Sequence, residues 1–192
     1  MSNAGQSWPP VETEPAVPHP KAPQPGSKLG VHYSHCFGCG DEVEVGLHLQ
    51  SSVTDGAEVV SEFAVTEAHQ GAPGLAHGGL LACAFDEALG AAVGNLLRKP
   101  AVTAKLETDF VRPVPVGSTL FISAKLDGVA GRKTYASAEG RLDAADGPVA
   151  VRARGLFVTV GVEHFTTHGD KDALDKLAAS ARRRREDWDI NP

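Results

Sequence analysis

The longest nearly uncharged segment of the sequence runs from Gly78 to Leu97, GGLLACAFDEALGAAVGNLL, and its only charged residues are Asp86 and Glu87. Its Ala- and Leu-rich composition predicts a helix of about five turns. A helix that is apolar on nearly all sides must be covered by other elements of the protein. The fold therefore has to surround one central helix and to accommodate two adjacent carboxylates in the middle of it.

The rest of the composition is that of a folded globular chain. Of 192 residues, 42% are hydrophobic and 22% are charged, which is enough to bury a core in one domain with room for extensions. The net charge of −6 argues against nucleic acid as a partner, because phosphate binding needs a basic face. No membrane span is expected, since residues 78–97 contain Asp86, Glu87 and Asn95 and many small side chains.

Two further features predict a cytoplasmic protein. The N-terminus has no basic start followed by an apolar stretch, so no secretory signal is expected. Three cysteines, an odd number in a chain of this length, do not suggest a disulfide framework. We therefore expect a reducing compartment.

The chain divides into three regions. Residues 1–30 contain many prolines and little to bury, which predicts a disordered or extended tail. Residues 31–162 contain the helix and all the strand patterns, so they form the predicted domain. Residues 163–192 predict a C-terminal helical extension, because residues 170–185 have helical composition.

Strand patterns flank the helix on both sides. Before it, alternating apolar residues on either side of a Thr-Asp-Gly turn predict a hairpin, and after it four more segments have a period of two. The predicted strands are 43–53, 57–65, 102–111, 119–126, 133–142 and 149–160. One long helix with about six mostly antiparallel strands predicts an α+β fold in which the sheet packs on the helix.

The helix contains two features that suggest catalysis. Glycines at 74, 78 and 79 surround its N-terminus, where free amides and the helix dipole stabilise negative charge such as that of a carbonyl oxygen under attack. Asp86 lies on the same face as Gly79, but roughly 10 Å further along the axis. A single helix cannot place both groups on one carbonyl, whereas two antiparallel copies across a dimer interface can. The alternative is a plain helix entry and a solvent-facing pair of acids.

Four segments resemble the PaaI-like branch of the hot-dog-fold acyl-CoA thioesterases. The principal one is HQGAPGLAHGGLLACAFDEALG, which is similar to the family's His-Gly-Gly motif and acidic helix. The others are HCFGCGDEVEVGLHLQ, VTAKLETDFVRPVPVG and GRKTYASAEGRL, in the same order as in the family. The resemblance implies a hot-dog fold over residues 31–162, hydrolysis of acyl-CoA, and a homodimer or tetramer whose active sites lie between subunits.

The resemblance also implies roles for single residues. Asp86 matches the carboxylate that acts as nucleophile or general base, and Gly79 matches the glycine whose amide polarises the thioester carbonyl. His77 matches the histidine that orders the loop. Thr103 matches a hydroxyl residue that holds the attacking water or the carboxylate. Glu87 ranks below Asp86, because one helical step turns it about 100° away from the Gly79 face.

Substrate contacts are expected at three places. Some relatives have Asn six residues before the motif histidine, but here that position is glycine, so Gln70 and Gly78 are the predicted contacts with the thioester. Three basic residues at strand ends are candidates for the phosphates of coenzyme A: Arg112, Arg132 and Lys133. The acyl chain is expected between helix and sheet, near Leu81, Phe85 and Leu89. No cofactor is expected beyond the coenzyme A of the substrate.

The cysteines and the histidines near them raise the question of a metal site. Cys36-x2-Cys39, with His32, His35 and His48 nearby, suggests zinc, but no second pair of ligands follows at regular spacing. We therefore expect no metal, and a packing role or a tight turn at residues 38–40 instead. Cys83 is expected to be a small core residue rather than a nucleophile.

Two alternative functions share the same fold. A hot-dog hydratase normally pairs an aspartate with a catalytic histidine in a different arrangement of loop and helix. A non-catalytic acyl-CoA binding protein would keep the groove and lack turnover. Measured hydrolysis distinguishes both alternatives from a thioesterase.

Overall fold

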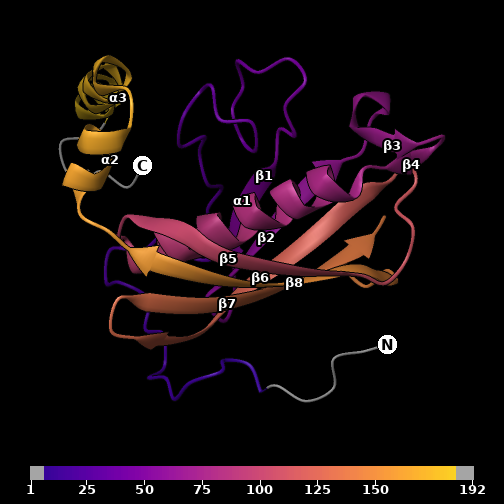
Figure 1. Cartoon of the computed structure of the whole chain (residues 1–192), viewed down its shortest axis with the longest axis horizontal. Coiled ribbons are helices and arrows are strands. Elements are labelled where there is room, and N and C mark those ends of the chain that lie inside the picture. The colour runs from indigo at the N-terminus through magenta and orange to yellow at the C-terminus, as the bar shows by residue number, and fades with distance from the viewer. Residues whose placement is uncertain (1–6, 185–192) are drawn as a thin grey trace.

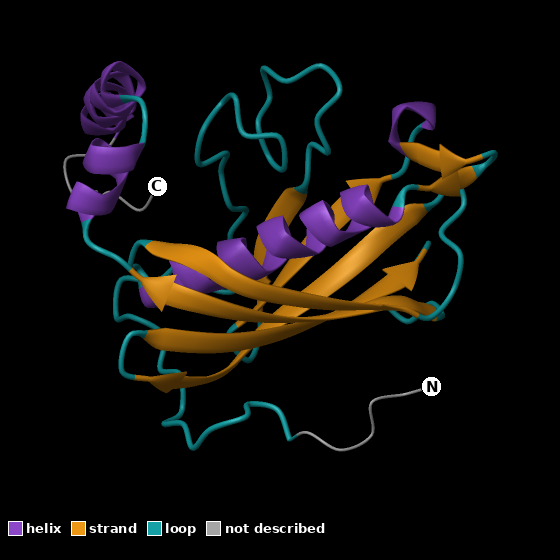
Figure 2. Ribbon diagram, in the orientation of Figure 1, coloured by secondary structure: helices purple, strands orange, loops and turns teal. Residues whose placement is uncertain are grey.

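The computed structural model describes residues 7–184, with side chains as far as residue 178. Six strands form one antiparallel sheet in the order β1-β2-β6-β7-β8-β5, and helix α1 (Gly78–Leu97) lies along one face of it (Figures 1 and 2). The strands are β1 (Gln50–Thr54), β2 (Glu58–Ala64), β5 (Ala101–Phe110), β6 (Thr119–Ala130), β7 (Lys133–Leu142) and β8 (Val149–Thr159). The predicted α+β class, with a sheet around one long helix, is confirmed.

Helix α1 is the centre of the core. Eight of its residues are buried, and Phe85, Ala88 and Leu89 have no exposed surface. By length and composition alone the helix could cross a membrane, but its buried face packs on the sheet as a core helix does. It ends at Arg98, which adopts a left-handed conformation (φ 52°) and donates its N–H to the carbonyl of Gly94.

The first predicted strand is shorter than expected. It begins at Gln50 instead of residue 43, because His48 has φ 50° and cannot continue an extended chain. Residues 43–49 form a loop instead, in which the amides of Leu47 and Leu49 donate to the carbonyls of Phe37 and Gly38. This loop and the segment before it stand beside α1 (Figure 1).

Three short elements precede α1. They are the 3-10 helix η1 (Glu67–His69) and the small hairpin of β3 (Gln70–Ala72) and β4 (Leu75–Ala76). The hairpin is braced by residues 113–117, since Ala76 N–H donates to Val114 and Val116 N–H donates to Gly74. These contacts fix where α1 begins.

The N-terminal segment is extended and packed against the domain, so the disordered alternative does not describe residues 7–30. Trp8 donates to Asp127 at 2.8 Å and packs edge-on against Tyr135, on the opposite face of the sheet from α1. Further along, His19 N–H donates to the carbonyl of Leu96, and Leu29 N–H donates to Ser51. These partly buried contacts repay part of the ordering entropy, which the proline content alone did not indicate. Residues 1–6 lie outside the described part of the chain.

The C-terminal extension contains two helices, α2 (Val162–His168) and α3 (Lys171–Arg184). They project from the end of β8, away from the body of the sheet (Figure 1). Residues 185–192 of the predicted extension lie outside the described part of the chain.

Candidate active site

Asp86 and Thr103 meet at the middle of α1. The Thr103 hydroxyl, on β5, donates to Asp86 Oδ1 at 2.8 Å. Asp86 is half-buried, whereas Thr103 is exposed on the edge strand of the sheet. The structure therefore places a carboxylate and a hydroxyl from two different elements side by side at the surface of the domain.

A bulge in β5 helps to aim the threonine. Thr103 pairs with Phe157 and Lys105 with Leu156, so Ala104 is the extra residue in the ladder between β5 and β8. A bulge of this kind bends the strand and redirects the side chain next to it. The ladder is thus irregular directly beside the residue that contacts Asp86.

The surroundings of Asp86 raise the pKa of its carboxyl above the ordinary value. Burial is the largest cause, and the negative charges of Glu87 and Cys36 add to it, while the hydrogen bond from Thr103 opposes it. A carboxylate that binds protons more readily than usual is a better general base.

A cavity of about 640 Å³ opens beside this pair. Asp86 and Thr103 line it together with Phe157, and from the N-terminal segment it is lined by Lys21, Pro23 and residues 27–34. Among the lining residues, Lys21, Lys28 and Arg98 are basic. These basic residues could not be predicted from the sequence, because nothing in a proline-rich segment indicates that it folds back over the helix.

The acyl-chain residues expected from sequence are not in this cavity. Leu81, Phe85 and Leu89 are at most 4% exposed and belong to the packed core between α1 and the sheet. From α1, the cavity is instead lined by small residues that include Gly90 and Ala91. The apolar pattern of the helix therefore predicted the face that packs in the core, and not the face that lines the cavity.

The N-terminus of α1 has a different arrangement. His77 is the N-cap residue, and its Nδ1 accepts the Gly79 N–H at 2.9 Å. The Gly79 amide, which was predicted to donate to the substrate carbonyl, therefore already donates its hydrogen bond to His77. The Gly78 N–H, at the first position of the helix, has no acceptor among the described residues.

Gln70 braces the loop in front of the helix. Its side-chain oxygen accepts the Gly74 N–H at 2.7 Å, across the β3–β4 turn. The strand passes so close to His77 that a side chain at Gly71 would lie 2.7 Å from the His77 Cα. Gln70 thus supports the segment that presents the free amide of Gly78.

The predicted site residues fall into two groups in one chain. Asp86 and Thr103 form one group, and His77, Gly78 and Gly79 form the other, with Gln70 beside them. Gly78 and Asp86 are eight helix positions apart, roughly 12 Å along the axis. The structure brings the members of each group together and keeps the two groups apart.

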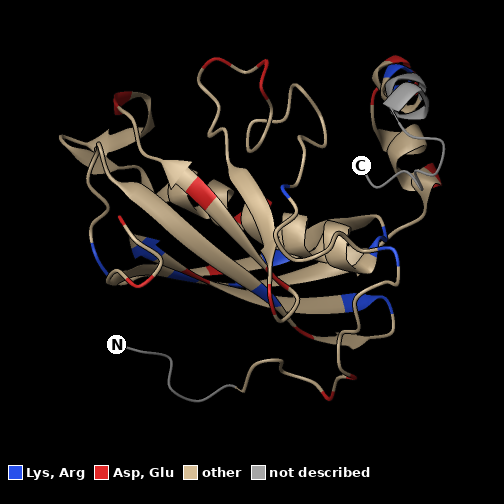
Figure 3. Cartoon of the chain, turned by 180° about the vertical axis from the view of Figure 1, so that it is seen from behind, with Lys and Arg blue, Asp and Glu red and all other residues tan. Residues whose placement is uncertain are grey.

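The residues predicted to bind the phosphates of coenzyme A lie at opposite ends of the sheet. Arg112 lies beyond the end of β5, where its guanidinium donates to the carbonyl of Val149. Lys133 pairs with Val158, whereas Phe110 pairs with Val151, so the two ends are roughly 23 Å apart along β8. Arg132 adjoins Lys133 in the β6–β7 turn. Lys and Arg are spread among the strands and turns together with Asp and Glu (Figure 3).

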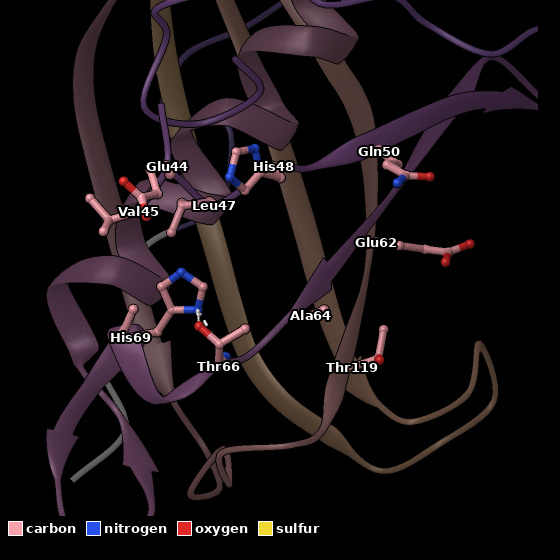
Figure 4. A pocket seen from close by; sticks show the side chains of 12 residues that line it. Glu44, Val45, Leu47, His48, Gln50, Glu62, Ala64, Thr66, His69 and Thr119 are labelled. Atoms are coloured by element: carbon pink, nitrogen blue, oxygen red, sulfur yellow. Dashed lines mark hydrogen bonds between the residues drawn. The ribbon is translucent and has the colours of Figure 1, made fainter. Parts of the chain in front are cut away.

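A smaller cavity of about 330 Å³ lies between η1, β2 and the loop before β1. In Figure 4 the side chains of Glu44, His48 and Glu62 point in different directions, and no interaction joins them. His69 is 3% exposed, and its Nδ1 is held by the main chain and the hydroxyl of Thr66. This cavity contains none of the predicted site residues and no group of side chains set up for catalysis.

His32, Cys36, Cys39 and Glu87 form a further group beside the larger cavity. Hydrogen bonds with Cys36 and then Glu87 raise the pKa of His32 to about 10. A hydrogen bond from Cys39 is the main cause that lowers the pKa of Cys36, while the same contact raises that of Cys39. Cys83 is half-buried against the core, and burial raises the pKa of its thiol.

Comparison with protein families gives a match over the centre of the chain. The sequence signature described as "Thioesterase superfamily" matches residues 73–145, from the β3–β4 turn to the turn after β7. Two curated relatives carry the name acyl-coenzyme A thioesterase THEM4. The Bos taurus protein is 38% identical over 98 residues and the Xenopus laevis protein 33% identical over 89 residues. These alignments cover 51% and 46% of the chain, which spans only 39% of the length of either relative.

Solved structures give the same fold. The crystal structure of a thioesterase superfamily protein is 31% identical, with a TM-score of 0.58, and the match covers 72% of this chain and 70% of that one. The PaaI protein of E. coli, from the phenylacetic acid degradation operon, is 22% identical with a TM-score of 0.54. That match covers 60% of this chain and 81% of the other. The sheet and central helix are therefore shared with solved members of that superfamily.

Proposed function

We propose that this chain, which belongs to the thioesterase superfamily, hydrolyses acyl-coenzyme A thioesters to a free acid and coenzyme A. The observation that carries the proposal is the Asp86 carboxylate, hydrogen-bonded to Thr103 at the edge of a cavity of about 640 Å³. The curated relatives named acyl-coenzyme A thioesterase support the choice of substrate class.

Asp86 would act as the general base. It would take a proton from a water molecule as the water oxygen bonds to the thioester carbonyl carbon, and Thr103 would hold the carboxylate in position. The carbon–sulfur bond then breaks, and the departing thiolate takes up a proton. Direct attack by Asp86, giving an anhydride that water opens, uses the same geometry.

The carbonyl oxygen would be stabilised at the N-terminus of α1. We assign this role to the amide of Gly78 in place of Gly79, because the Gly79 N–H is donated to His77. Together with the helix dipole, one such donor contributes about 3 kcal/mol to the transition state. His77 and Gln70 would act as positioning residues for this amide.

A complete site would need two chains. A reacting carbonyl must lie about 3 Å from both its donor and its base, whereas Gly78 and Asp86 of one chain are roughly 12 Å apart. Self-association is supported by β5, which is an edge strand, and by exposed apolar residues around the helix N-terminus: Leu75, Phe110 and Val111. We therefore propose a homodimer with two sites, each with Asp86 from one chain and Gly78 from the other.

Coenzyme A would bind at the mouth of the larger cavity. Lys21, Lys28 and Arg98 line that cavity and supply positive charge for the phosphates. Arg132 and Lys133 lie toward the same end of the sheet as Thr103, since Lys133 and Val102 both pair with Val158. Arg112, at the opposite end, is a candidate only for a second chain's substrate.

The primary experiment measures release of free thiol from acetyl-, hexanoyl-, palmitoyl-, phenylacetyl- and benzoyl-CoA by the wild type and Asp86→Asn. Hydrolysis by the wild type that is lost in the variant supports the proposal and defines the acyl group. Binding of these thioesters with no hydrolysis by either protein would contradict it and favour a non-catalytic acyl-CoA binding protein.

The two-chain site has its own test. Gly78→Pro removes the amide at a helix position that tolerates proline, after an extended His77 (ψ 128°). It should lower kcat about 10²–10³-fold, whereas Gly78→Ala keeps the amide and serves as the control. Co-expression of Gly78→Pro with Asp86→Asn should restore roughly a quarter of wild-type activity, because half the dimers would be mixed and each would contain one intact site. Failure to restore activity would show that both groups act within one chain.

A further inference from the structure

Glu87 and the Cys-x2-Cys turn form a cluster that the proposed hydrolysis does not use. His32, Cys36 and Cys39 come from the loop that stands beside α1, and Glu87 comes from the middle of α1 itself. All four side chains are partly buried. The loop and the helix thus contribute to one site from positions about fifty residues apart in sequence.

The distances within the cluster are those of a metal site. One ligand atom from each residue lies within 4.8 Å of all the others. The Cys36 sulfur is 3.4 Å from Glu87 Oε2, the Cys39 sulfur is 3.0 Å from His32 Nδ1, and His32 Nδ1 is 3.5 Å from Glu87 Oε1. Tetrahedral zinc with its usual bond lengths separates such ligand atoms by about 3.3–3.8 Å. No pair of these ligand atoms exceeds the upper end of that range by more than about 1 Å, so a cation at the centre of the cluster would need side-chain shifts of about that size.

The turn between the cysteines is shaped around the sulfur of Cys36. The Gly38 N–H points at that sulfur at 3.3 Å, and the Gly40 N–H donates to the Cys36 carbonyl at 2.8 Å. A side chain at Gly38 would lie 2.4 Å from Glu87 Oε2, and one at Gly40 would lie 2.3 Å from the Ser34 carbonyl. An amide that supports a ligating sulfur is a typical outer contact of a metal site.

We propose that His32, Cys36, Cys39 and Glu87 bind one Zn²⁺ ion through Nδ1, two thiolates and a carboxylate oxygen. Two sulfurs, an imidazole and a carboxylate in a tetrahedron suit zinc better than calcium or magnesium, which prefer oxygen ligands. Binding would release the thiol protons to solvent. Because four protein ligands complete the coordination shell, the ion would be structural and would leave no position for a reactive water.

The fourth ligand explains why the sequence did not indicate this site. No second regular pair of ligands follows Cys36 and Cys39 in the sequence, which therefore predicts no metal. The group that completes the set is Glu87, which belongs to the helix and is next to Asp86. His35, which pairs with Glu42 at 3.4 Å, and His48 lie outside the cluster.

Such a site would hold one wall of the larger cavity in place. His32 and Cys39 line the cavity that Asp86 and Thr103 also line, and Glu87 is one residue from Asp86. A bound zinc ion would fasten the loop to the helix beside the proposed base. The inference does not depend on the proposed hydrolysis, because it rests on a different set of side chains.

The first test measures the metal content of the full chain, purified without a metal-affinity step, by mass spectrometry. We expect one zinc per chain in the wild type, and at least a tenfold lower content in the double variant Cys36→Ser, Cys39→Ser and in Glu87→Gln. Cys83→Ser and His35→Ala are the matched controls, one thiol and one imidazole outside the cluster, and should keep the metal. Equal metal content in the wild type and the double variant would contradict the proposal.

The second test does not depend on whether the variants fold. Co²⁺ is added to the metal-free wild-type chain, and the absorption of tetrahedral cobalt–thiolate bonds is recorded; one equivalent should saturate the signal, and Zn²⁺ should abolish it. Thiol titration of the untreated protein should show Cys36 and Cys39 protected until a chelator is added. A disulfide between them, or no cobalt–thiolate absorption, would overturn the assignment.

Discussion

Asp86 and Glu87 are neighbours in sequence, yet their surroundings differ in almost every respect. Asp86 faces the edge strand β5, where its hydrogen-bond donor is the Thr103 hydroxyl. Glu87 faces the loop before β1, where it meets an imidazole and a thiol. One helical step turns successive side chains by about 100°, so a pair of adjacent acids serves two walls of the same cavity. Adjacency along a helix therefore does not imply a shared function, and each acid must be tested separately.

The largest expected effect separates the two acids by rate. Asp86→Asn should lower kcat about 10²–10⁴-fold, because a general base is lost while size and hydrogen-bonding capacity are kept. Glu87→Gln should lower kcat at least ten times less, since this carboxylate takes no part in the proposed chemistry. The measurement is kcat on whichever acyl-CoA the wild type hydrolyses fastest. An equal or larger loss in Glu87→Gln that the double variant Cys36→Ser, Cys39→Ser does not share would reverse the assignment of the two residues.

The next effect is the loss of thermal stability when zinc is removed. It should depend on Glu87 and the two cysteines and not on Asp86. If zinc joins the loop to α1, removing it with a chelator should lower the Tm of the wild type and of Asp86→Asn alike. A ligand present at about a thousand times its Kd stabilises by about 4 kcal/mol, which corresponds to roughly 8–16 °C for a chain of this size. The double variant Cys36→Ser, Cys39→Ser should already melt low and respond little to the chelator. An unchanged wild-type Tm would leave the loop held by its hydrogen bonds alone.

Sequence periodicity predicted the parts of this molecule whose side chains repeat regularly. The bounds of α1 and β7 agree with the prediction at both ends, because apolar spacing and the flanking turn residues determine them locally. The loop at 43–49 was mistaken for a strand, since its alternation hides the left-handed His48. Contacts between distant segments were also missed, such as the return of residues 21–34 over the helix.

The candidate site shows the same limit. Motif spacing led to Asp86 and to the helix N-terminus, and the resemblance led to Thr103. Neither indicated that the Gly79 N–H donates to His77, because this cap depends on the orientation of the His77 imidazole ring. Nor did either join Glu87 to Cys36, since that contact connects two elements far apart in sequence. Local chemistry was predictable, and its partners across the fold were not.

A smaller effect tests the donor on the Asp86 side. Thr103→Val removes the hydroxyl with little change in shape, and should lower kcat roughly tenfold, as expected for the loss of a hydrogen bond to a charged group. That hydrogen bond lowers the pKa of Asp86, so its removal should raise this pKa and move the acidic limb of the kcat/KM profile to higher pH. Thr103→Ser retains a donor and should keep the wild-type profile. A profile unchanged in Thr103→Val would mean that the two side chains are not coupled in solution.

The smallest effect is on thermal stability: Asp86→Asn should raise the Tm at neutral pH although it lowers the activity. Burial raises the pKa of this carboxyl in the folded chain, so its contribution to stability is fully present below the unfolded-state pKa and is lost as pH rises through the folded-state value. At neutral pH the wild type therefore bears the cost of a half-buried charge, and Asp86→Asn should melt at a higher temperature although it is inactive. The difference should shrink as the pH is lowered from about 8 to about 4, where the wild-type carboxyl takes up its proton. Thermal melts of both proteins across that range provide the measurement, with Glu62→Gln, an exposed carboxylate on β2, as the control. A lower Tm for Asp86→Asn at neutral pH would mean that Asp86 stabilises the fold through its charge, which a residue retained for catalysis at the expense of stability would not do.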